Sequence, residues 1–179
     1  GKEGIGRVLE TSSEVKHLKV GQLVLLAGGE NGTWRSEIVA PASGFLPLPN
    51  MGPLDSNMID QLSMTIVNPM TALLMLTEFV DLQKGQWIVQ SASNSAVGGY
   101  VIQLAKQRGI KTINVVRRPG LEKDLLAKGA DVVLIDGPDL AEKISIATGG
   151  DPIILALDAV GGETYIRLAN SLGYGGRLV

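Results

Sequence analysis

Cysteine is absent from this chain of 179 residues, and histidine occurs only once, as His17. Without cysteine the chain can form neither disulfides nor thiolate metal sites, and the redox compartment stays open. A lone imidazole does not make a zinc site, so we interpret His17, which stands between Lys16 and Leu18, as a surface residue. We therefore expect no bound metal.

An excess of basic charge and long apolar runs are also lacking. The chain has 16 basic and 18 acidic residues, for a net charge of −2. Binding to nucleic acid or to an anionic membrane surface needs a basic field, so we expect neither partner. No apolar run reaches the length of a membrane span, so we expect none. Strand-like sequence at both ends, from Gly1 and up to Val179, suggests a piece of a longer polypeptide.

The residue pattern divides the chain near position 67. Up to about Pro53 it predicts short strands separated by glycine-containing turns, at residues 5–10, 22–26, 34–39 and 44–48. From Asn68 it predicts helices, with Asn68 as N-cap and Pro69 in the first helical position. We therefore expect a β-rich domain over residues 1–67 and a second domain over residues 68–179.

Strands and helices alternate in the second domain. We expect strands from Trp87 and at residues 110–116, 132–135 and 153–157, with a last, incomplete strand near 176–179. The expected helices begin near 96 and cover 119–128, 138–148 and 163–172. This order predicts an α/β fold with a Rossmann-type parallel sheet and helices on both faces.

The turn at residues 91–98, Ser-Ala-Ser-Asn-Ser-Ala-Val-Gly, joins the first of these strands to the next helix. A helix N-terminus there would offer free N–H groups and partial positive charge to a pyrophosphate. Ser93 and Ser95 occupy the two earlier positions of the usual glycine fingerprint, and only Gly98 keeps its glycine. The serine hydroxyls are expected to donate bonds to phosphate, although an ordinary loop would have the same spacing.

A basic pair, Arg117-Arg118, ends the next strand, about 20 residues beyond the turn, where such folds read the adenosine ribose. An acid at this position favours NAD, whereas an arginine accommodates the 2′-phosphate of NADP. The pair therefore predicts NADPH. The alternative is a solvated charge pair before a helix.

The sequence resembles the zinc-independent branch of the medium-chain dehydrogenase/reductase superfamily, and within it the mitochondrial-type 2-enoyl thioester reductases. The matching segments are Gly-Lys-Glu-Gly-Ile-Gly-Arg-Val at 1–8, Gly-Thr-Trp-Arg at 32–35, Val-Asn-Pro-Met-Thr-Ala at 67–72, Gln-Ser-Ala-Ser-Asn-Ser-Ala-Val-Gly at 90–98, Thr-Ile-Asn-Val-Val-Arg-Arg at 112–118 and Asp-Ala-Val-Gly-Gly at 158–162. Lys2 stands where zinc alcohol dehydrogenases have a histidine ligand, and an ammonium group does not ligate zinc without losing its proton.

The resemblance implies NADPH-dependent reduction of trans-2-enoyl thioesters, on coenzyme A or acyl carrier protein, in fatty acid synthesis. It also implies a partial GroES-like catalytic domain at 1–67, a Rossmann domain at 68–179 and a homodimer. The location would be the mitochondrial matrix in a eukaryote and the cytoplasm in a bacterium.

Site residues follow from the same resemblance. It implies cofactor contacts at Asn68, Asn94, Ser95, Ala96, Val97, Gly98, Arg117, Arg118 and Pro119. Trp34 would lie near the substrate cleft, with a packing role as the alternative. The family's catalytic tyrosine would precede Gly1, because Tyr100, Tyr165 and Tyr174 do not match its motif.

Three other functions remain open. The first is an NADPH-dependent quinone oxidoreductase of the same branch, whose glycine-rich turn differs from the turn here. The second is a non-catalytic, truncated nucleotide-binding fragment. The third is an interaction module without a nucleotide site.

Overall fold

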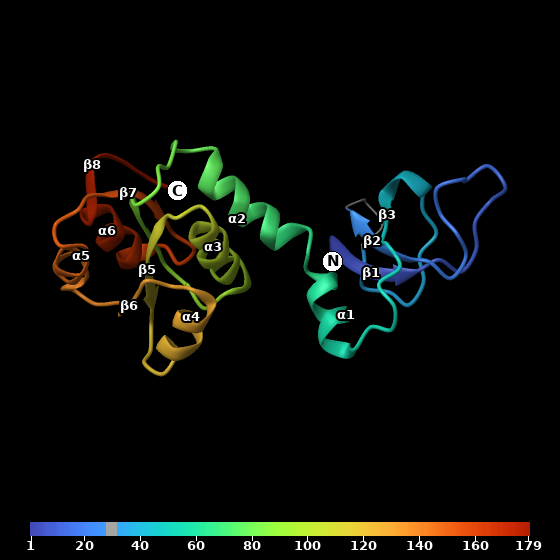
Figure 1. Cartoon of the computed structure of the whole chain (residues 1–179), viewed down its shortest axis with the longest axis horizontal. Coiled ribbons are helices and arrows are strands. Elements are labelled where there is room, and N and C mark those ends of the chain that lie inside the picture. Colours follow the sequence, from blue (N-terminus) through green and yellow to red (C-terminus); the bar gives the residue numbers. More distant parts are fainter. Residues whose placement is uncertain (28–31) are drawn as a thin grey trace. The chain divides into compact units, whose positions relative to one another are not determined.

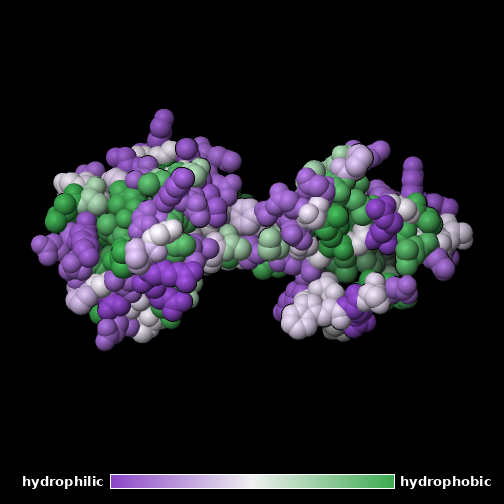
Figure 2. All heavy atoms as spheres, turned by 90° about the horizontal axis from the view of Figure 1, so that it is seen from below, coloured by the Kyte–Doolittle hydropathy of each residue, from purple (hydrophilic) through white to green (hydrophobic). Residues whose placement is uncertain are grey.

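In a computed structural model, which describes residues 1–27 and 32–179, the chain forms two compact units, Gly1–Val67 and Asn68–Val179 (Figure 1). We call them the N-terminal and C-terminal units. Polar residues cover much of the visible surface of each unit. Exposed apolar residues are scattered among these polar residues (Figure 2).

The N-terminal unit is built on a small antiparallel sheet in the order β1-β2-β3. Its elements are β1 (Glu3–Arg7), β2 (Leu23–Ala27), a 3-10 turn η1 (Ala42–Gly44), β3 (Phe45–Pro47) and α1 (Ser56–Ser63). The helix begins where Asp55 Oδ1 accepts a hydrogen bond of 2.8 Å from Met58 N, an ordinary N-cap. Sequence analysis missed this helix, although Asp55 was a usable start signal.

The strand expected at residues 34–39 is wrong. These residues have no regular structure, and the side chains of Trp34 and Val39 are 92% and 97% exposed. The segment contains strand-favouring residues such as Trp34, Ile38 and Val39, but a strand also needs a neighbour for its backbone N–H and C=O groups. No described strand pairs with this segment.

The C-terminal unit confirms the predicted α/β fold. Its five strands pair in parallel in the order β6-β5-β4-β7-β8. They are β4 (Trp87–Gln90), β5 (Lys111–Val116), β6 (Val132–Ile135), β7 (Ile153–Leu157) and β8 (Leu172–Leu178). The last strand begins at Leu172, earlier than expected, because the preceding helix ends at Asn170.

Helices cover both faces of this sheet. They are α2 (Val67–Thr77), α3 (Ala96–Gln107), α4 (Glu122–Lys128), α5 (Leu140–Thr148) and α6 (Gly162–Asn170). Residues of α2, α3 and α4 share buried clusters with Ile88 and Val116, whereas α5 and α6 pack with Val89 and Ile113 on the opposite face (Figure 1). Alternate residues of each strand therefore enter opposite cores, which explains why buried strands read as continuous apolar runs.

The start of α2 corrects the prediction for Asn68. The helix begins at Val67, and the Glu3 carboxylate accepts hydrogen bonds from Ile66 N at 3.2 Å and Val67 N at 2.8 Å. An acid from β1 thus supplies the acceptor and the favourable charge at this helix end. Local sequence gave no sign of it, because Glu3 lies far from Val67 along the chain.

Within the described residues, no single helix has the length and apolar character to cross a membrane. Taken together, α1 and α2 pass that test as a broken pair, by length and composition only.

Candidate nucleotide-binding site

The candidate site lies at the carboxyl edge of the parallel sheet. Strands β5 and β6, which follow β4 in the chain, lie on one side of β4, and the later strands β7 and β8 lie on its other side. The strand order therefore reverses between β4 and β7. Open α/β sheets bind ligands outside the carboxyl ends of their strands at such a reversal. The segments that begin there are residues 91–95 after β4 and 158–161 after β7.

At the start of α3, three backbone donors have no acceptor among residues 1–27 and 32–179. Ser95 is the N-cap, and its Oγ accepts a hydrogen bond of 3.1 Å from Gly98 N. The N–H groups of Asn94, Ala96 and Val97 donate to no acceptor in the described part of the chain. Because Asn94, Ser95 and Ala96 are exposed, these donors and the helix dipole form a setting suited to an anion.

Gly98 is required by the packing of this turn. A Cβ on Gly98 would stand 2.6 Å from Ser93 O and 2.8 Å from Ser93 Cα, and both are backbone atoms that have little freedom to move. The first turn of α3 therefore lies directly against the strand-to-helix turn. This close packing explains why glycine is retained at the last position of the fingerprint.

The two serines of the turn have different roles. Ser93 is fully buried, and its Oγ is placed to donate to Gln90 O at 3.0 Å or Val115 O at 3.2 Å. The expectation that Ser93 donates to phosphate is therefore wrong, because its hydroxyl ties the turn to β4 and β5. Ser95 Oγ accepts from Gly98 N, which leaves its own proton free to reach a ligand.

Ala92 holds the turn in an unusual backbone conformation. With φ of 47°, it is the only non-glycine residue with positive φ among the described residues. For a residue with a Cβ this left-handed region costs about 1–2 kcal/mol. The strain is retained at a position between two buried serines, Ser91 and Ser93, that bond to neighbouring strands.

The arginine pair lies next to this turn. Ser93 N donates to Val115 O at 3.3 Å, so the end of β5, which leads into Arg117 and Arg118, is held against the turn. Both arginines and Pro119 are exposed, and neither guanidinium has a partner in the described part of the chain. The nearby acid Glu122 accepts from Gly120 N at 2.7 Å instead.

Sequence analysis did not predict a second set of hydrogen bonds at the site, which centres on Asp158. Ser91 Oγ donates to Asp158 Oδ1 at 2.6 Å, which joins the ends of β4 and β7 at the strand reversal. The same carboxylate accepts from Val160 N at 3.2 Å and Gly161 N at 2.7 Å. In the sequence analysis Ser91 and Asp158 appear only within the segments that match the family. The position of Asp158, an acid directly after a buried strand, could have indicated a role at this edge of the sheet.

Two further predicted residues, Asn68 and Trp34, belong to other segments of the chain. Asn68 is half-buried in the first turn of α2 and makes no side-chain hydrogen bond in the described part of the chain. Trp34 belongs to the N-terminal unit and is 92% exposed, so the packing interpretation of Trp34 is wrong.

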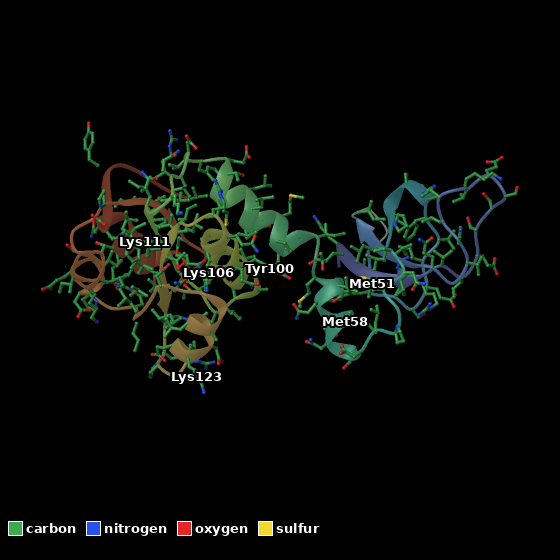
Figure 3. All side chains as sticks on the ribbon, viewed as in Figure 1. Met51, Met58, Tyr100, Lys106, Lys111 and Lys123 are labelled. Atoms are coloured by element: carbon green, nitrogen blue, oxygen red, sulfur yellow. The ribbon has the colours of Figure 1, made fainter. Side chains whose placement is uncertain are left out.

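The remaining candidate side chains are dispersed. Tyr100 lies on α3, as Figure 3 shows, whereas Tyr165 and Tyr174 are exposed on α6 and β8. His17 is exposed, as expected, with Nε2 3.2 Å from Ala42 O. No three metal-ligating side chains gather among residues 1–27 and 32–179.

The chain resembles known reductases in sequence and in fold. Residues 96–179 match the family model described as "Zinc-binding dehydrogenase". The mitochondrial enoyl-[acyl-carrier-protein] reductase of Rattus norvegicus is 40% identical over 185 residues, which cover all of this chain and 48% of the relative. The chain thus spans about half the length of this relative.

The solved structure of the Etr1p/NADP/crotonyl-CoA complex matches 99% of this chain and 54% of its own, with a TM-score of 0.87 and 31% identity. The chain is therefore similar in sequence and in fold to enoyl thioester reductases. The structure of a quinone oxidoreductase of Pseudomonas syringae also matches, with a TM-score of 0.83, 26% identity, and coverage of 99% of this chain and 54% of that one.

Proposed function

We propose that the carboxyl edge of the C-terminal unit binds NADPH. The free N–H groups of Asn94, Ala96 and Val97 would hold the pyrophosphate, with the Ser95 hydroxyl beside them. Arg117 and Arg118 would bind the 2′-phosphate, and two unpaired guanidinium groups beside the turn are the observation that carries this proposal. Asn68, Gly98 and Pro119 complete the proposed set of contacts.

The proposed reaction of the whole protein is the reduction of a trans-2-enoyl thioester. NADPH, when bound, would be the source of the hydride that adds to C3 of the substrate. Negative charge then develops on the thioester oxygen, where a fixed hydrogen-bond donor stabilises the enolate before a proton reaches C2. The part played by this chain is to hold the cofactor by its phosphates and thereby fix its position, with residues 158–161 anchored through Asp158 at the strand reversal.

Cofactor choice tests the first proposal. We expect the double variant Arg117→Ala/Arg118→Ala to lose NADPH affinity by about tenfold to a hundredfold, because one or two charge-assisted hydrogen bonds are lost. NADH affinity should change by less than about threefold, since NADH lacks the 2′-phosphate. Lys123→Ala is the matched control, because Lys123 is another exposed cation, on the neighbouring helix α4 (Figure 3). Equal losses for both cofactors would contradict the assignment.

Substrate class tests the second proposal. The fold similarity to a quinone oxidoreductase keeps quinone reduction as an alternative. The longest product of the gene, assayed with NADPH, should reduce crotonyl-CoA faster than a quinone. The reverse order would favour the alternative, and NADPH binding without turnover of either substrate would favour a non-catalytic nucleotide-binding protein.

The partners and location of the whole protein remain predictions. We propose an enoyl-CoA or enoyl-acyl carrier protein substrate and a homodimer, together with a mitochondrial matrix location if the source is a eukaryote. Sedimentation of the longest gene product, and imaging of the tagged protein in its own cells, would test the last two.

A further inference from the structure

A continuous row of polar side chains crosses the buried sheet beneath α3. Gln90 Nε2 donates to Asn114 Oδ1 at 2.8 Å, and Asn114 Nδ2 donates to Thr112 Oγ1 at 2.9 Å and Val132 O at 3.1 Å. Asp131 Oδ2 accepts from Thr112 N at 2.8 Å at the far end. We call Gln90, Asn114, Thr112 and Asp131 the polar row.

Most of the polar row occupies buried positions of the kind that apolar residues usually fill in a parallel sheet. Gln90 and Asn114 are 2% and 0% exposed, and they lie opposite each other in register on β4 and β5. Their strand neighbours on the same face, Ile88 and Val116, enter ordinary apolar clusters. Buried amides stabilise a fold little more than well-packed apolar residues of the same shape, but they fix which groups must meet.

One end of the polar row reaches Gly98, at the end of the turn formed by residues 91–98. Gln90 Nε2 also donates to Gly98 O at 3.0 Å. Gly98 is thereby held on three sides: its N–H by Ser95 Oγ, its Cα face by the Ser93 backbone and its carbonyl by Gln90. Of these contacts, only the bond from Gln90 anchors α3 to the side chains of the sheet.

We propose that Gln90 and Asn114 are positioning residues, which set the first turn of α3 so that its free N–H groups converge on the cofactor phosphates. Asn114 acts through Gln90: its Oδ1 fixes the amide orientation that places Nε2 against Gly98 O. This proposal rests on the NADPH site proposed above. It predicts that loss of the row changes cofactor affinity more than it changes stability.

The test replaces both amides with apolar side chains of similar shape, in the double variant Gln90→Met/Asn114→Leu. We expect the NADPH dissociation constant to rise by about tenfold, because the donors of α3 lose their fixed direction. The melting temperature should stay within about 3 °C of the parent, since both partners of the Gln90–Asn114 bond are removed together. Outside this pair, only Gly98, Thr112 and Val132 lose a side-chain donor. Gln90→Met alone gives a second variant in case the double variant folds poorly.

Gln103→Met is the matched control. Gln103 Nε2 donates to Gly99 O at 3.1 Å, which is the same type of bond to the same turn but lies within α3 itself. Its loss leaves the polar row intact, so the NADPH dissociation constant should change by less than about twofold.

Amide hydrogen exchange without cofactor separates this inference from the proposed function. Loss of the polar row should speed exchange at residues 98–101, while the central amides of β4 and β5 keep their protection. If the parent protein fails to bind NADPH but the exchange changes as expected, the proposed site is wrong and the positioning of α3 stands. Unchanged affinity and exchange in both variants, or an affinity loss no larger than the loss of folded protein, would overturn the inference.

Discussion

The first turn of α3 meets the backbone of Ser93 at Gly98, where a Cβ would lie 2.6 Å from Ser93 O. The contact leaves no room for any side chain, and it places the N-terminus of α3 at the end of β4. Phosphate binding in this unit therefore depends on a packing contact as much as on charge.

Gly98→Ala should distort this contact. We expect a loss of about 1–3 kcal/mol in the free energy of unfolding, since backbone atoms must shift to admit the methyl group. NADPH affinity should fall with it because the helix donors move. Urea denaturation and fluorescence titration measure the two effects, and Gly44→Ala, at an open position in the N-terminal unit, is the control. An unchanged midpoint for Gly98→Ala would show that the turn can relax.

Ser95→Asp separates helix capping from phosphate binding. Aspartate is as good an N-cap as serine and favours the helix dipole, so the stability should hold or rise slightly. The added carboxylate would face the cofactor phosphates, so NADPH affinity should fall by at least about tenfold. Ser95→Asn, which caps without charge, should stay close to the parent. Undiminished NADPH binding by Ser95→Asp would place the phosphates away from this helix end.

The bond between Ser91 and Asp158 should hold residues 158–161 in place. Asp158→Asn keeps the side-chain shape but replaces the charged carboxylate with a neutral amide. In the parent this carboxylate accepts hydrogen bonds from Ser91 Oγ, Val160 N and Gly161 N. We expect a loss of about 1–2 kcal/mol in unfolding free energy and faster amide exchange at Val160 and Gly161. Ser91→Ala should give part of the same effect. If exchange at both amides is unaltered in Asp158→Asn, the carboxylate does not order this loop.

Asp136 should make stability depend on acid pH. The Arg167 side chain, which donates from Nε at 2.8 Å and Nη2 at 2.9 Å, lowers the pKa of Asp136 below its usual value, with Thr164 adding a further bond. The pKa of Asp136 is therefore lower in the folded than in the unfolded state. The ionised carboxylate then contributes its full stabilisation above the unfolded-state pKa of about 4, and this stabilisation is lost as the pH falls through the folded-state pKa.

Asp136→Asn should therefore lower the unfolding free energy by about 1–2 kcal/mol at pH 7, and the difference from the parent should shrink as the pH is lowered from 7 to 2. Asp139→Asn is the control, since Asp139 pairs with Lys143 on the exposed surface and should matter much less. Denaturation curves across this pH range measure both variants. A deficit that persists at pH 2 would mean that the charge of Asp136 is not its source.

The sequence alone determined the architecture of the C-terminal unit. Residues 132–135 and 153–157 are strands with the expected limits, because a strand buried on both faces is a short apolar run bounded by turn residues. The start of α3 at Ala96 and the need for glycine at position 98 also followed from local pattern. The domain identities assigned to residues 1–67 and 68–179, and the contacts of the site residues, stay predictions.

Only the tertiary structure decided which polar groups meet across distant parts of the chain. Glu3, rather than Asn68, serves the start of α2, Ser93 turns its hydroxyl inward, and Gln90 reaches Gly98 from below the helix. Periodicity reports which face of an element is buried, because burial depends on local hydrophobicity. It does not report hydrogen-bond partners, because these depend on which strands become neighbours, and that is settled when the whole sheet assembles.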